Sequence, residues 1–65
     1  MTRKELNLSP KNSKKLDKIE NKIFGYSSLD KRMDYVDELS LSFIFDDLSD
    51  EEVDNIDEYI RDLVV

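Results

Sequence analysis

The chain has 65 residues, of which 38% are hydrophobic and 40% charged, with a net charge of −6 and neither cysteine nor histidine. This composition excludes disulfides, thiolate or imidazole metal sites, and nucleophilic catalysis by a Ser-His or Cys-His pair. A chain of this length forms one small domain with a modest core, so we expect oligomerisation or a partner to contribute to its stability.

The charges are divided between the two halves of the chain. Residues 1–26 carry seven basic and three acidic residues, a net charge of +4, whereas residues 27–65 carry three basic and thirteen acidic residues, a net charge of −10. The two halves attract each other within one fold, or they present charged surfaces to partners. Because no apolar run is long enough to span a membrane and Met1–Pro10 lacks a signal-peptide core, we expect a cytoplasmic protein.

The first predicted helix follows an N-terminal arm. Residues 1–8 show no helical period and are predicted to be extended. Ser9 and Pro10 are typical of a helix start, because serine caps the first amides and proline is tolerated at the first helical position. The helix is predicted over about 10–24, with Gly25 as its left-handed cap. Its apolar residues are spaced by three and four: Leu16, Ile19, Ile23 and Phe24.

A second helix is predicted over about 29–46, with Ser27 or Ser28 as its N-cap. Residues 39–45 also alternate apolar and polar side chains as a strand does, so an α+β fold with a short strand at 39–45 is the alternative. We favour the helix, which is apolar around most of its circumference near its end. This feature suits a central helix or one buried in a homodimer.

Several apolar side chains exceed what so small a fold hides easily. We expect Phe43 and Ile60 in the core, and Phe45, Leu48 and Tyr35 at an exposed docking or dimer surface. These residues support an alternative function, a small helical interaction or regulatory module that docks through an apolar face.

The third predicted helix covers 50–64 and has the clearest pattern. Ser49 and Glu52 match a capping box, in which each side chain accepts a hydrogen bond from the other residue's amide. An apolar stripe follows at helical spacing: Val53, Ile56, Tyr59, Ile60, Leu63 and Val64. The expected fold is therefore all-α, a small domain of three helices with an extended arm, in which no cofactor or metal is required.

A neighbouring sector of the third helix is acidic. Such a sector keeps a small protein soluble, or it imitates the phosphates of DNA for a DNA-binding partner, since helical neighbours three and four residues apart lie about 5–6 Å apart. The candidate residues for partner binding are Asp50, Asp54, Asp57, Glu58 and Asp62.

The first helix raises the opposite possibility, direct binding of nucleic acid. Five lysines share much of its surface: Lys11, Lys14, Lys15, Lys18 and Lys22. We regard this function as the least favoured, because the helix has no arginine, the chain has no aromatic RNA-binding motif, and the net charge is negative.

The amino-acid usage of the chain resembles that of small acidic inhibitors encoded by phages of low-GC Gram-positive bacteria. The stretch Lys18-Ile19-Glu20-Asn21-Lys22-Ile23, the acidic second half and the absence of Cys and His carry this resemblance. The group includes DNA mimics that inhibit host nucleases and repair enzymes, and inhibitors of the replication sliding clamp. The resemblance implies a non-enzymatic inhibitor whose partner is a host nucleic-acid-handling protein.

Overall fold

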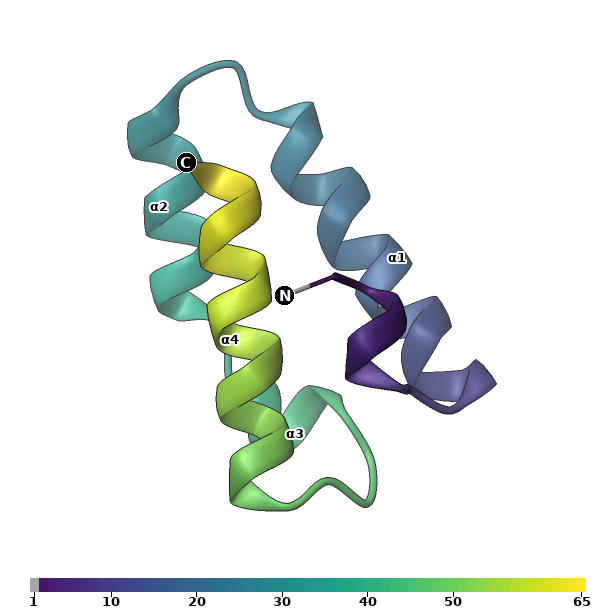
Figure 1. Cartoon of the computed structure of the whole chain (residues 1–65). Coiled ribbons are helices and arrows are strands. Elements are labelled where there is room, and N and C mark those ends of the chain that lie inside the picture. Colours follow the sequence, from purple (N-terminus) through teal and green to yellow (C-terminus); the bar gives the residue numbers. More distant parts are fainter. Residues whose placement is uncertain (1) are drawn as a thin grey trace.

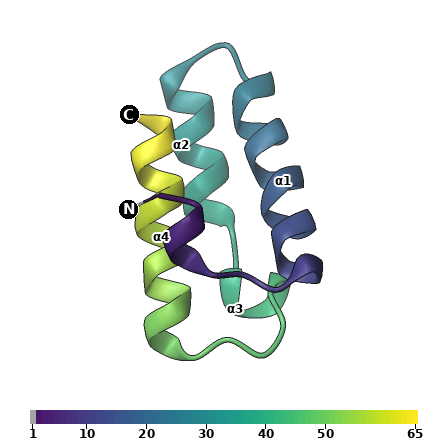
Figure 2. The same ribbon diagram turned by 45° about the vertical axis from the view of Figure 1, so that its right-hand side comes forward.

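A computed structural model describes residues 2–65, and the predicted all-α class is confirmed. A short 3-10 helix, η1 (Lys4–Leu6), precedes four α-helices: α1 (Pro10–Gly25), α2 (Leu29–Glu38), α3 (Leu41–Ile44) and α4 (Asp50–Val64). Helices α1 and α4 run in the same direction and α2 runs against them, while α3 lies at the end of the bundle where α4 begins (Figure 1). In the turned view, η1 lies across the front between α1 and α4 (Figure 2).

Serine residues start the three long helices, as the sequence predicts. The side-chain oxygen of Ser9 accepts from the amide of Asn12, and that of Ser28 accepts from the amide of Lys31. At α4, Ser49 and Glu52 form the complete capping box, with both amide-to-side-chain distances at 3.2 Å. These bonds satisfy amides that have no partner inside their own helix, so the starting points of the helices are locally encoded.

The predicted helix over 29–46 is wrong in its middle. Leu39 has an extended backbone (φ −69°, ψ 132°) and Ser40 is also non-helical, so the segment divides into α2 and α3. The strand alternative for 39–45 is also not found, since residues 2–65 contain no strand. The physical reason is packing, because the two non-helical residues rotate the chain and turn a different side of α3 toward the core than a continuous helix would.

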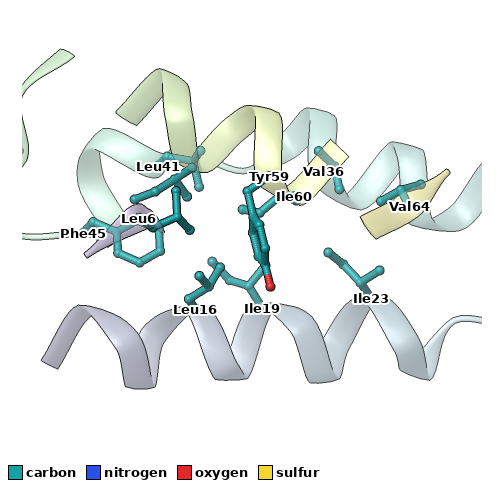
Figure 3. Packing of buried hydrophobic residues seen from close by; sticks show 11 residues of the cluster. Leu6, Leu16, Ile19, Ile23, Val36, Leu41, Phe45, Tyr59, Ile60 and Val64 are labelled. Carbon is teal, nitrogen blue, oxygen red and sulfur yellow. The ribbon is translucent and has the colours of Figure 1, made fainter. Parts of the chain in front are cut away.

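This rotation reverses the predicted roles of two phenylalanines. Phe45 is only 4% exposed and lies in the core near Leu6 and Leu41, whereas Phe43 is 89% exposed (Figure 3). Leu41 and Phe45 are one helical turn apart and face inward together, so Phe43, halfway between them, faces outward. The assignment of Phe43 to the core and of Phe45 to an exposed surface is therefore wrong, while Ile60 is fully buried as predicted.

The described part of the predicted arm, residues 2–8, contains η1 and is therefore not extended throughout; Met1 lies outside the described residues. Thr2 and Glu5 exchange hydrogen bonds as in a capping box, with the amide of Thr2 3.1 Å from a Glu5 carboxylate oxygen. The turn that follows places Leu6 in the core, and Asn7 leaves it with a positive φ of 50°. Asparagine tolerates this left-handed conformation better than most residues. The pattern Thr-x-x-Glu is a sequence signal for this turn. The prediction of an extended arm relied instead on the absence of a helical period.

The end of α1 also differs from its prediction. Gly25 is the last residue of the helix and does not have a positive φ. The carbonyl groups at this end find another donor, because Nε of Arg32 in α2 lies 3.2 Å from the carbonyl oxygen of Ile23 and 3.0 Å from that of Tyr26. A side chain from the next helix therefore replaces the glycine cap.

The core is a single cluster between the helices. Tyr59 extends from α4 toward α1 across its middle, and Ile23, Val36 and Val64 close one end (Figure 3). The apolar stripes predicted for α1 and α4 supply most of the cluster. Its buried members are Leu6, Leu16, Ile19, Ile23, Val36, Leu41, Phe45, Ile56, Tyr59, Ile60 and Val64.

A buried amide fixes the loop between α3 and α4. Asn12 is only 4% exposed; its Nδ2 donates to the carbonyl oxygen of Asp46 (2.9 Å) and its Oδ1 accepts from the Asp46 amide (3.1 Å). The next residue, Asp47, has a positive φ of 57°. Because both polar groups of the Asp46 backbone bond to one side chain of α1, this loop is held against the start of α1.

The two phenylalanines give a matched test of the fold. We expect Phe45→Ala to lower the free energy of unfolding by about 3–5 kcal/mol, because it removes a buried aromatic ring and leaves a cavity. Phe43→Ala should change it by no more than about 0.5 kcal/mol, because the ring is exposed. Urea unfolding followed by circular dichroism measures both; equal losses would contradict the observed orientation of α3.

The Asn12 amide gives a second test. Asn12→Ala leaves a part-buried amide and carbonyl of Asp46 without their partner, and we expect it to lower the free energy of unfolding by about 1–3 kcal/mol. Asn21→Ala is the matched control, since Asn21 is exposed on the same helix. A stability of Asn12→Ala equal to that of Asn21→Ala would show that the amide pair contributes nothing.

Candidate functional site

The acidic sector of α4 faces away from the core. Its orientation follows from the apolar stripe of the same helix, because Ile56, Ile60 and Val64 are buried and direct the opposite side outward. Four of the five predicted partner-binding acids are exposed: Asp50, Asp54, Glu58 and Asp62.

Asp57, the fifth predicted acid, does not share this exposed position. It is half-buried at the edge of the sector, where its Oδ2 lies 3.1 Å from Nε of Arg61. Nη1 of Arg61 also lies 3.2 Å from Asp37 of α2. The hydrogen bonds that Arg61 donates, first to Asp57 and then to Asp37, raise the pKa of Arg61. The only base of α4 is thus turned toward α2, and it neutralises Asp57 rather than interrupting the exposed acids.

Four exposed acids of α4, spaced by three, four and four residues, form a regular row that we call the acidic ladder; Asp50 and Glu52 are also exposed but lie outside this row. Glu51, which the predicted set leaves out, belongs to it because it is exposed and lies seven residues before Glu58. Among residues 2–65, no ion pair joins a member of this row to a basic side chain. Four unpaired carboxylates thus lie along about three turns of one rigid helix. The acidic ladder consists of Glu51, Asp54, Glu58 and Asp62.

The exposed surface of α1 is basic. A shallow hollow of about 390 Å³ on this surface is lined by Pro10 and the side chains of Lys11, Lys14, Lys15 and Lys18. The lysine ladder, as we call the exposed row along this surface, consists of Lys11, Lys14, Lys18 and Lys22.

Attraction between the two halves of the chain is limited to one carboxylate. Asp46 lies 3.0 Å from Nζ of Lys11 and 2.9 Å from Nζ of Lys15, which also donates to the carbonyl of Ile44 (2.7 Å). Hydrogen bonds from Lys15 and then Lys11 lower the pKa of Asp46. Within residues 2–65 this is the sole ion-paired link between the basic and acidic halves, so most of the two charged surfaces stays separate.

The three residues predicted for apolar docking do not form a common surface. Phe45 is in the core, which corrects its assignment. Tyr35 is half-buried, with its ring centroid 5.7 Å from that of Tyr26. Leu48 is half-buried and lines an open cavity of about 440 Å³ between the starts of α1 and α4. Phe43 instead offers an exposed aromatic ring.

The position of α1 relative to α4 depends on a network that sequence reasoning missed. Arg3 lies 2.5 Å from Glu20 and 2.6 Å from Asp17, and it donates to the carbonyl of Ser13 (2.5 Å). The hydroxyl of Tyr59 donates to the other oxygen of Glu20 (2.5 Å). Glu20 therefore connects η1, α1 and α4. Glu20 lies 39 residues before Tyr59, and no local sequence pattern predicts a bond at that separation.

Residues 2–65 contain no cluster of three side chains that could hold a metal ion. No helix in this part of the chain is long and apolar enough to cross a bilayer. Neither a protein-family model, nor a curated protein, nor a solved structure matches the chain.

Because Tyr59 is buried and bonded to Glu20, we expect the free energy of unfolding to change with pH in the alkaline range. Burial first, and then the bond to Glu20, raise the pKa of Tyr59 to about 12, so the folded state favours the neutral phenol. An unfolded tyrosine has a pKa of about 10, so this contribution is complete below about pH 10 and is lost as pH rises through about 12.

We expect the free-energy difference between the wild type and Tyr59→Phe to shrink over this interval. Urea unfolding of both proteins at about pH 9 and about pH 11.5 measures it, and the comparison cancels the contributions that both proteins share. The change should not exceed about 3 kcal/mol, the free-energy equivalent of two pKa units. A constant difference at both pH values would show that Tyr59 does not titrate abnormally.

Proposed function

We propose that the chain is a non-enzymatic binding protein that blocks a nucleic-acid-handling protein by placing the acidic ladder in its DNA-binding site. The observation that carries this proposal is the unpaired state of the ladder, since its four carboxylates have no ion-pair partner within residues 2–65. Unpaired charges on a surface remain available to a complementary partner, and they steer the encounter with it.

The charge density of the ladder supports an imitation of DNA. From Glu51 to Asp62 the helix rises about 16 Å and presents four negative charges. One strand of DNA carries about five phosphates over the same length, at about 3.4 Å each. The ladder is also rigid before binding, because the capping box fixes its start and the buried stripe fixes its rotation. Little conformational entropy is therefore lost when a partner binds it.

The resemblance to small acidic phage inhibitors supplies the class of partner. On this basis we propose a host protein such as a nuclease, a polymerase, a sliding clamp or a repair enzyme, bound in the host cytoplasm. The group includes proteins that act by binding alone, which agrees with a chain that lacks histidine and cysteine.

Phe43 supports a second candidate function, docking of a small interaction module through an apolar contact. Its ring is 89% exposed, yet α3 beneath it is held by the buried Leu41 and Phe45 and by the Lys15 bond to the Ile44 carbonyl. An aromatic ring presented on a fixed support is a suitable anchor for a protein pocket. This contact would depend little on salt, in contrast to the acidic ladder.

Charge reversal within α4 tests the first candidate. We expect Asp54→Lys/Glu58→Lys to lose its partner in affinity capture from a nuclease-treated lysate of a low-GC Gram-positive bacterium. The matched control is Asp34→Lys/Glu38→Lys, which reverses two exposed acids with the same spacing on α2 and should retain the partner. A short DNA duplex added at constant ionic strength should displace the captured protein, because both would compete for one site.

Two results would contradict this proposal. If the captured protein stays bound to Asp54→Lys/Glu58→Lys, the ladder is not the contact. If it resists both the DNA duplex and high salt but is lost with Phe43→Ala, the apolar docking function replaces DNA mimicry.

A further inference from the structure

The exposed rows of α1 and α4 have the same spacing and opposite charge. Members of each row follow one another at intervals of three, four and four residues, and each lysine position differs from its acidic counterpart by forty. Both rows lie on helices of nearly equal length, 16 residues in α1 and 15 in α4. The paired positions are Lys11 and Glu51, Lys14 and Asp54, Lys18 and Glu58, and Lys22 and Asp62.

On each of the two helices, the side chains whose charge is opposite to that of the ladder are ion-paired with residues outside the ladder. On α1, the acids Asp17 and Glu20 lie outside the lysine ladder and are paired with Arg3. On α4, the only base, Arg61, is paired with Asp57 and Asp37. The ion pairs of Arg3 and Arg61 therefore neutralise the mismatched charges that each helix carries, and Asp46, beside Lys11 and Lys15, is the one acid that remains against the lysine ladder within residues 2–65.

The two ladders do not neutralise each other within one chain. Each lies on the exposed side of its helix, opposite the apolar stripe that faces the common core. Of the eight side chains only Lys11 is ion-paired within residues 2–65, and its partner is Asp46 rather than the acidic ladder. Rows that match in spacing, are opposite in sign and face outward from one core can meet only between separate molecules.

We propose that the lysine ladder of one copy binds the acidic ladder of a second copy. This contact is heterologous, because a different surface is used on each molecule, so it either closes into a ring or continues as an open chain. At ionic strengths near 0.1 M the Debye length is about 10 Å, so the remote charges of two molecules that each carry −6 are screened while charges in direct contact are not.

The proposed contact goes beyond the proposed function and uses a surface, the lysine ladder, that the proposed function does not need. It would, however, cover the acidic ladder. Self-association and binding of a nucleic-acid-handling protein would then exclude each other, so the free ladder would be most abundant at low protein concentration. Exposed ion pairs contribute little individually, and we expect a Kd on the order of 0.1–1 mM for the contact.

Analytical ultracentrifugation of the full chain at low and high salt tests this contact. The weight-average mass should rise with concentration at about 50 mM salt and fall toward that of the monomer at about 500 mM, where charges in solution are screened within a few ångströms. Lys14→Glu/Lys18→Glu should remain monomeric at low salt. Lys4→Glu/Lys31→Glu is the matched control, since it reverses two exposed lysines outside the ladder and gives the same net charge, −10 instead of −6.

Mixing two reversed proteins makes the test independent of net charge. Asp54→Lys/Glu58→Lys should also be monomeric alone, but it should associate with Lys14→Glu/Lys18→Glu, because the mixture again offers opposite charges at these positions. The neutral variant Lys14→Gln/Lys18→Gln should lose self-association as well, which excludes an effect of the introduced glutamates. Far-UV circular dichroism verifies that each variant is folded.

Three results would overturn the proposal: a monomeric wild type at millimolar concentration and low salt, self-association that Lys14→Glu/Lys18→Glu retains, or a mixture of reversed proteins that does not associate. The proposed function fails separately. Lys14→Glu/Lys18→Glu should lose self-association while still capturing the nucleic-acid-handling partner, whereas Asp54→Lys/Glu58→Lys should lose both.

Discussion

The bond pair between Asn12 and the backbone of Asp46 is the constraint on which the arrangement of the second half depends. It joins the start of α1 to the loop after α3, so it holds the end of α3 and the loop that leads to α4 against α1. Lys15 adds to the same junction through the Ile44 carbonyl and the Asp46 carboxylate. With the junction fixed, Leu41 and Phe45 face the core and Phe43 faces outward. A chain of 65 residues has little apolar surface to bury. Hydrogen bonds from side chains to the backbone therefore determine much of its conformation.

A second set of polar contacts positions η1 between α1 and α4. Glu20 receives Arg3 on one oxygen and Tyr59 on the other, which connects three elements through one carboxylate. Both contacts are partly buried, where a hydrogen bond to a charged group is stronger than at the surface. These contacts hold Arg3, and η1, which follows Arg3 directly, places Leu6 in the core. The N-terminal segment thereby becomes part of the bundle, and the orientation of α1 relative to α4 is set by it.

The charged surfaces are consequences of this polar framework. Arg3 and Arg61 bind the acids that lie beside the two ladders, and Asp46 binds two lysines at the junction. What remains exposed is a basic row on α1 and an acidic row on α4. The proposed DNA mimicry and the proposed self-association both rest on this separation. A partner with a basic groove and a second copy with a basic helix would recognise the same carboxylates, and the two differ in whether the lysine row takes part.

Local sequence determined the helices and their starting points. Ser9, Ser28 and the Ser49–Glu52 box mark helix starts because a cap needs only a side chain and an amide three residues away. The stripe of α4 likewise determined which of its sides is acidic and exposed. The break at Leu39 and Ser40, the exchange of Phe43 and Phe45, and the replacement of a glycine cap by Arg32 were decided only in the tertiary structure. The Arg32 contacts join two neighbouring helices across six and nine residues. The break and the phenylalanine orientations depend on core contacts between residues distant in sequence, and the burial gained there outweighs the local preference for one continuous helix.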